Sequence, residues 1–187
     1  MNWLERVPFW TRIIGQTGIS SLLDVGCNAG WNMLAARTVK PALWCRGVEI
    51  NSRARQQARN YLIDTYDYLD ELFEEKIIST IPRQPKSTSG HDDPRLLFEL
   101  CVTSGVLIHI EASELESFMK KIVRLSNGYV LAVEYDADEE RETLYRGHKG
   151  KLWSRPYGKL YQDLGLKLVD TGPAEGYNEC TYWLLER

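Results

Sequence analysis

The sequence predicts a Rossmann-like α/β fold: a mainly parallel sheet with helices on both faces and an antiparallel hairpin at its C-terminal edge. Short apolar runs alternate with amphipathic segments along most of the chain, and right-handed crossovers between such strands produce a parallel sheet. Two closely spaced apolar runs near the C-terminus, at 167–170 and 181–186, supply the antiparallel pair. With 187 residues, 26% of them charged and 43% hydrophobic, the composition is that of one globular domain spanning 1–187.

The elements follow from two kinds of hydrophobic spacing. Helices are expected where apolar residues recur three and four positions apart. These segments are 1–18, 31–39, 52–61, 115–125 and 157–164, and the acidic, aromatic segment 64–76 is a further candidate. Strands are expected at short apolar runs bounded by turn residues. These runs are 20–25, 43–50, 77–81, 96–110, 129–134, 167–170 and 181–186.

Two polar segments interrupt the alternation. Residues 82–94 contain three prolines and a glycine in a polar remainder, which is typical of an exposed loop. Residues 136–155 are too charged to form a core element, and we expect them as an insertion outside the sheet.

Composition excludes several classes of protein. A net charge of −3 gives no overall basic field for a nucleic acid, so a nucleic-acid partner is not favoured. No apolar run is long enough to span a membrane, and the charged N-terminal segment does not resemble a secretory signal. The cysteines are scattered without a CxxC pair, which fits buried thiols in a reducing cytoplasm rather than a zinc site or disulfides. They are Cys27, Cys45, Cys101 and Cys180.

The strongest site signal is a glycine-rich turn between an expected strand and helix. Asp24, Gly26 and Gly30 lie in this turn, and Glu49 follows nineteen residues later at the end of the next strand. Glycines let the backbone approach a ligand closely, and the helix N-terminus offers free amide donors. An acidic side chain at the tip of the second strand can accept both hydroxyls of a ribose. The pattern therefore predicts a ligand of the nucleoside type.

The loop sequence distinguishes between two such ligands. A dinucleotide fold normally has GxGxxG, whereas Asn28 occupies the middle glycine position here, so NAD is the alternative rather than the first choice. The string LDVGCxxG resembles the first motif of the class I methyltransferases, which implies S-adenosylmethionine (SAM) as cofactor. The residues expected to contact it are Asp24, Gly26, Cys27, Asn28, Gly30, Glu49, Ile50, Thr103 and Ser104.

A further resemblance covers the chain from about residue 21 to the C-terminus. The strings LLDVGCNAGWN, GVEIN, TSGVLIHI, EY, YRGHKGKL and TYWLLER together resemble the pseudaminic acid biosynthesis-associated methylases, a bacterial family linked to surface-sugar gene clusters. This resemblance implies a methyltransferase that modifies oxygen or nitrogen of a small acceptor, such as a nucleotide sugar or a sialic-acid-like sugar.

Residues downstream of the glycine turn are candidates for acceptor chemistry. His109 lies at or just after the end of the fourth expected strand. It could remove a proton from the acceptor, because imidazole exchanges protons near neutral pH; it could equally be structural. A cationic cluster within 136–155 could hold a carboxylate or phosphate. The expected acceptor contacts are Glu134, Tyr135, Tyr145, Arg146, His148 and Lys149.

Two other functions remain open at this point. The chain could be a non-catalytic SAM-binding subunit of a larger assembly or, less favoured, a nucleic-acid methyltransferase. Its assembly is open as well, since it could also form a homo-oligomer. Transfer of a methyl group from a sulfonium requires alignment of the reactants rather than a metal ion, so none is expected.

Overall fold

The computed structural model describes residues 2–63 and 97–187. The N-terminal half begins with a 3-10 turn, η1 (Trp3–Arg6), which continues directly into α1 (Val7–Thr17). Pro8 stands in the first turn of α1, where its missing N–H costs nothing, and Gly18 ends the helix in a left-handed conformation. There follow β1 (Ser21–Val25), α2 (Trp31–Val39), β2 (Trp44–Val48) and α3 (Ser52–Ile63).

The second described segment completes the sheet. It contains β3 (Phe98–Ser104), the 3-10 turn η2 (Leu107–His109), α4 (Ala112–Leu125), β4 (Ser126–Glu134), β5 (Arg141–Glu142), β6 (Trp153–Ser154), α5 (Tyr157–Asp163), β7 (Lys167–Pro173) and β8 (Thr181–Glu186). The six-stranded sheet has the order β2-β1-β3-β4-β8-β7. The first four strands are parallel neighbours, while β8 is antiparallel to both β4 and β7. The predicted fold class, including the C-terminal antiparallel edge, is confirmed.

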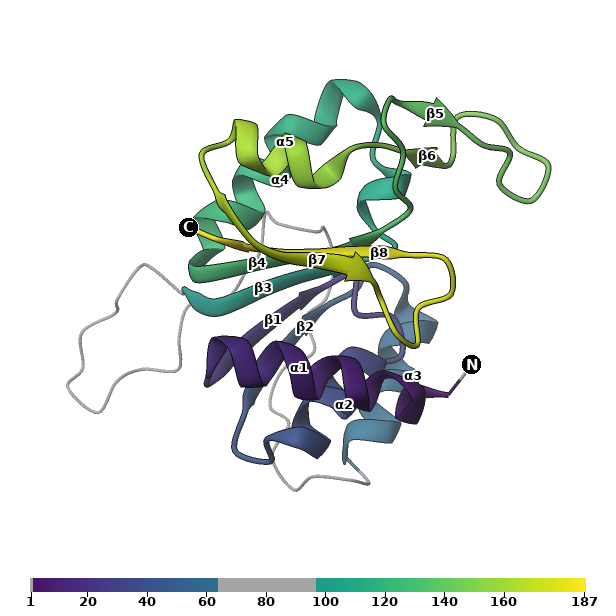
Figure 1. Ribbon diagram of the computed structural model, residues 1–187. Helices are drawn as coiled ribbons and strands as arrows, with labels where there is room; N and C mark the ends of the chain where they lie inside the picture. Colours follow the sequence, from purple (N-terminus) through teal and green to yellow (C-terminus); the bar gives the residue numbers. More distant parts are fainter. Residues whose placement is uncertain (1, 64–96) are drawn as a thin grey trace, which may run out of the picture.

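Helices cover both faces of this sheet. In Figure 1, α1, α2 and α3 lie below it and α4 and α5 lie above. Each layer closes its own hydrophobic core: one contains Trp10 and Ile13 of α1, and the other contains Met119 of α4 and Tyr161 of α5. Successive residues of a strand point into opposite cores: Leu22 of β1 packs in the first core and Leu23 in the second.

The expected elements differ from the observed ones in a few places. The apolar run 96–110 is not one strand, because Gly105 adopts a φ of 65° after β3 and the chain turns into η2. Within the charged segment 136–155, β5 and β6 form a separate two-stranded hairpin. This segment is expected to be too charged for a core element, and most of it is exposed, but its end is buried, since Leu152 is 8% and Arg155 2% exposed. The Arg155 guanidinium is compensated by Glu140, 2.6 Å from its Nε, and by the Ile110 carbonyl oxygen.

Three expectations fall outside the described residues: the helix at 64–76, the strand at 77–81 and the exposed loop at 82–94. In the part of the chain that is described, no helix has the length and apolar character needed to cross a membrane.

Candidate cofactor-binding site

The glycine turn after β1 is held in a left-handed conformation at three positions. The φ angles are 75° at Gly26, 49° at Asn28 and 79° at Gly30. The amides of Gly26 and Cys27 both donate to the carbonyl oxygen of Val48, at 2.7 and 3.0 Å, so the turn is fixed to the end of β2. A Cβ on Gly26 would lie 2.3 Å from Val106 Cγ2. Glycine is therefore required at position 26 by both backbone conformation and space.

A cavity of about 310 Å³ opens at this turn, which is within the usual size range of small-molecule sites. It lies beyond the carboxyl ends of β1 and β3, the edge where open parallel sheets bind their ligands. The first turn of α2 forms part of its wall, and the amides there have no acceptor within the helix. The lining residues are Arg6, Gly26, Cys27, Asn28, Ala29, Trp31, Asn32, Gln57 and Ser104.

Glu49 stands next to this turn, directly after β2. One carboxylate oxygen accepts the amide hydrogen of Asn28 at 2.9 Å, and the other accepts that of Asn51 at 2.8 Å. The buried Arg55 fixes the backbone at the same point, because its Nη1 donates to the carbonyl oxygens of Glu49 and Ile50, each at 2.8 Å. The carboxylate is thus held against the glycine turn at the end of β2.

A buried polar network lies beneath the cavity. Asn32 donates from Nδ2 to Asp24 at 3.2 Å, and its Oδ1 accepts from the hydroxyl of Tyr177 at 2.7 Å. Trp10 in turn donates to that hydroxyl at 3.0 Å. Asp24 is fully buried, and its second oxygen has no hydrogen-bond partner among the described residues. Burial raises the pKa of Asp24 to about 7, although the Asn32 hydrogen bond and the positive charge of Arg6 oppose this rise.

The β3 end of the site is organised by a second buried carboxyl group. Glu134 accepts the amide hydrogens of Val106 and Leu107, each at 3.2 Å, and so fixes the turn that follows Ser104. Burial raises the pKa of Glu134 to about 7, against the opposing effect of the two amides. Thr103 and Glu134 are both 0% exposed, whereas Ser104 reaches the cavity wall.

The candidate base lies on the same edge of the sheet. His109 is exposed, and its Nδ1 is 2.6 Å from the carbonyl oxygen of Lys151. A carbonyl only accepts, so Nδ1 carries the hydrogen and the neutral ring keeps Nε2 as its free acceptor. The ring also contacts Tyr145 edge to face, with centroids 5.1 Å apart. The structure therefore brings His109 next to the cationic segment.

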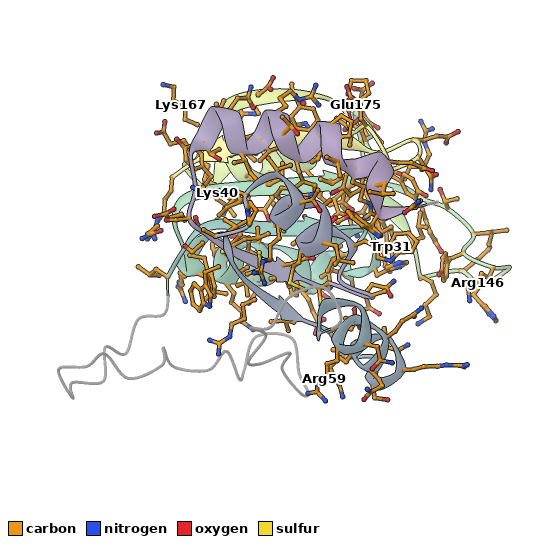
Figure 2. All side chains as sticks on the ribbon, turned by 90° about the horizontal axis from the view of Figure 1, so that it is seen from below. Trp31, Lys40, Arg59, Arg146, Lys167 and Glu175 are labelled. Atoms are coloured by element: carbon orange, nitrogen blue, oxygen red, sulfur yellow. The ribbon has the colours of Figure 1, made fainter. Side chains whose placement is uncertain are left out.

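Figures 1 and 2 relate this segment to the cavity. In Figure 1 the N-terminus and the β5–β6 hairpin lie on the same side of the molecule. The N-terminus is below the sheet, and the hairpin is above it. In Figure 2, Trp31 of the cavity wall and Arg146 of the hairpin again share one side, opposite Lys40 and Lys167. Arg146 lies over the Tyr145 ring at 5.2 Å.

The residues chosen from the sequence thus occupy different places. Gly26, Cys27, Asn28 and Ser104 line the cavity, while Gly30 is the N-cap of α2 and Glu49 is hydrogen-bonded to the turn. Asp24, Thr103 and Glu134 lie beneath the surface, and Ile50 is 59% exposed. The acceptor candidates Tyr135, Tyr145, Arg146, His148 and Lys149 are absent from the cavity lining.

Sequence reasoning missed four polar or aromatic wall residues: Arg6, Trp31, Asn32 and Gln57. Asn32 carried a detectable signal, since it is a polar residue on the apolar side of a helix, directly after the glycine turn. Among the described residues, no group of His, Cys, Asp and Glu side chains could hold a metal ion.

A larger cavity of about 520 Å³ lies between α4 and α5. Its walls include Leu115, Met119, Leu160 and Arg155, and none of the residues chosen from the sequence. The smaller cavity, where the glycine turn and the strand ends meet, is therefore the candidate site.

Neither the protein-family models nor the curated protein sequences compared with this chain match it. Solved structures are similar. Mitomycin 7-O-methyltransferase MmcR is 16% identical over 97% of this chain, with a TM-score of 0.69, and this chain spans 53% of that protein. A SAM-dependent methyltransferase from Clostridium acetobutylicum ATCC 824 is 12% identical over 100% of this chain and 92% of its own, with a TM-score of 0.69.

A third similar structure is the N-terminal domain of EvdMO1 in the presence of S-adenosylhomocysteine (SAH) and D-fucose. It is 12% identical over 97% of this chain and 82% of its own, with a TM-score of 0.65. Identities this low establish the fold and leave the resemblance to the pseudaminic acid-associated methylases a prediction. The chain has the Rossmann-like α/β fold shared by these methyltransferases.

Proposed function

We propose that this chain is a SAM-dependent methyltransferase that acts on a small acceptor. The observation that carries the proposal is the cavity at the glycine turn, with Glu49 bonded to that turn from the end of β2. The methyltransferase names of similar structures support the same function. All four cysteines are free, which supports a reducing compartment such as the cytoplasm.

The residues present fit this cofactor. Glu49 would accept the ribose hydroxyls, and the backbone of the turn at Gly26, Cys27 and Asn28 would hold the methionine part. Asp24 and Asn32 lie beneath the turn and would stabilise its conformation, because both are buried and they are hydrogen-bonded to each other. SAM supplies an electrophilic methyl group, so the protein has to align the acceptor and help to remove its proton.

We further propose an acidic or phosphate-bearing acceptor, such as a nucleotide sugar or a sialic-acid-like sugar. His109 would be the base through Nε2, since the Lys151 carbonyl oxygen fixes the hydrogen on Nδ1. Arg146, His148 and Lys149 on the hairpin would hold the acidic group. The D-fucose in the EvdMO1 crystals supports a sugar acceptor.

The test is methyl transfer from isotopically labelled SAM to a panel of nucleotide sugars and nonulosonic acids. We expect label in at least one acidic member, and a loss of kcat by about 10²- to 10⁴-fold in His109→Ala with unchanged binding of SAH. Unchanged turnover in His109→Ala would remove His109 as the base. SAH binding without transfer to any acceptor would instead favour a non-catalytic subunit.

A further inference from the structure

Arg6 brings a positive charge to the cofactor cavity from outside the sheet. It is the last residue of η1, and it lines the cavity together with Trp31 and Asn32 of α2. Its Nη1 donates to Asn32 Oδ1 at 2.7 Å. The guanidinium lies 4.2 Å from the ring centroid of Tyr177 and 5.4 Å from that of Trp31. Arg6 is therefore held on three sides by neutral groups.

None of these direct partners carries a negative charge. An amide oxygen and two aromatic rings carry no net charge, and within residues 2–63 and 97–187 the buried Nε of Arg6 has no hydrogen-bond partner. Burial of a donor without an acceptor is costly, more so for a charged group. Such a group is typical of a site that awaits an anionic ligand.

The buried carboxyl group of Asp24 does not fill this role directly. Asn32 stands between the two, because its Oδ1 accepts from Arg6 while its Nδ2 donates to Asp24. Asp24 has no exposed surface, whereas Arg6 is half-buried and reaches the cavity wall. The guanidinium thus remains available to a ligand on the cavity side.

The position of η1 is fixed by the C-terminal part of the chain. Gly176 has a φ of 81°, and a Cβ there would lie 2.6 Å from the carbonyl oxygen of Glu5 and 2.9 Å from the Arg6 amide nitrogen. Tyr177, the next residue, supplies the ring that lies against the guanidinium. The 174–180 turn and η1 therefore pack backbone to backbone, and the guanidinium is positioned before any ligand arrives.

We propose that Arg6 binds the carboxylate of the methionine part of SAM and SAH. The inference rests on the proposed function. The carboxylate is the only anionic group of this cofactor, and Arg6 is the only cationic side chain among the described residues that line the cavity. Guanidinium matches the planar geometry of a carboxylate. Arg6 is then a cofactor-binding residue contributed by the N-terminal turn rather than by the glycine motif.

The test is a thermodynamic cycle that combines one substitution in the protein with the removal of one group from the ligand. Calorimetry measures the affinity of wild type and Arg6→Met for SAH and for 5′-methylthioadenosine, which lacks the amino-acid part. Because hydrogen bonds to charged groups contribute about 1.5–3 kcal/mol, we expect Arg6→Met to bind SAH about 10- to 100-fold more weakly. Its affinity for 5′-methylthioadenosine is expected to change less than about twofold.

Arg12→Met is the matched control. Arg12 likewise lies over aromatic rings, of Phe9 and Tyr182, but it pairs with Glu175 and is absent from the cavity lining. We expect both affinities to be unchanged in this variant. Arg6→Lys keeps the charge, so it is expected to restore part of the SAH affinity even if the methionine variant folds poorly.

Equal losses for both ligands in Arg6→Met, or no loss for either, would overturn the proposal, because Arg6 would then be structural or uninvolved. A wild-type chain that binds neither ligand would instead contradict the proposed function. Decarboxylated SAH, offered to the wild type, repeats the test without any change to the protein and is expected to bind as weakly as SAH binds to Arg6→Met.

Discussion

Two buried carboxyl groups support the site from below, and each is a titrating group. Asp24 and Glu134 are both fully buried, and burial raises the pKa of each to about 7. The native state thus retains protons that the unfolded chain has already released. These groups contribute stability at low pH that is lost as pH rises from the unfolded to the folded pKa.

Glu134→Gln tests this at a single residue. The amide oxygen can still accept from Val106 and Leu107, but the side chain no longer ionises. Between the ordinary value of 4.5 and about 7, Glu134 is expected to lower the free energy of unfolding as pH rises, by up to about 1.4 kcal/mol per pH unit. Urea unfolding across this window is predicted to show a flatter pH dependence in Glu134→Gln. An identical slope in both proteins would show that Glu134 ionises normally.

At the scale of elements, the packing of α5 against β8 depends on a glycine inside a helix. Gly158 is buried, and a Cβ there would lie 2.2 Å from the indole of Trp183. Gly15 of α1 is the opposite case, since it is exposed and a Cβ would meet nothing within 4 Å. The same substitution should therefore have opposite effects in the two helices.

We predict that Gly15→Ala stabilises the fold by about 0.5–1 kcal/mol through helix propensity. Gly158→Ala should destabilise it by about 1–3 kcal/mol, because overpacking against Trp183 outweighs propensity. Thermal or urea unfolding of the two variants measures both. A gain in stability in Gly158→Ala would mean that α5 and β8 are not packed as described.

Most of the elements could be predicted because their signals are local. The spacing of apolar residues in α1 and α4, and the turn residues Gly18 and Gly30, act within one or two helical turns. The break after Ser104 was less visible, because Val106, Leu107 and Ile108 continue the apolar run although the chain has already turned. That turn depends on Glu134, a residue from another strand.

At the scale of the whole molecule, the predictable part of the site is the part that lies close together in sequence. The glycine turn and Glu49 belong to one βαβ unit, so their spacing alone indicates their proximity. Arg6 could not be placed in this way, because its position depends on Gly176 and Tyr177 at the other end of the chain. His109 and Tyr145 likewise meet only through the folded hairpin.

The central claim is that the cavity at the glycine turn binds the methyl donor, and calorimetric titration of the purified chain with SAH and with NAD tests it most directly. The wild type is compared with Glu49→Gln and with the control variant Glu186→Gln. Glu186 also ends a strand, but it is exposed and lies at the end of β8 that is remote from the cavity. We predict that the wild type and Glu186→Gln bind SAH equally and NAD not measurably, while Glu49→Gln binds SAH about 10- to 100-fold more weakly. Binding of NAD without SAH, or SAH affinity unaffected by Glu49→Gln, would contradict the assignment of this site.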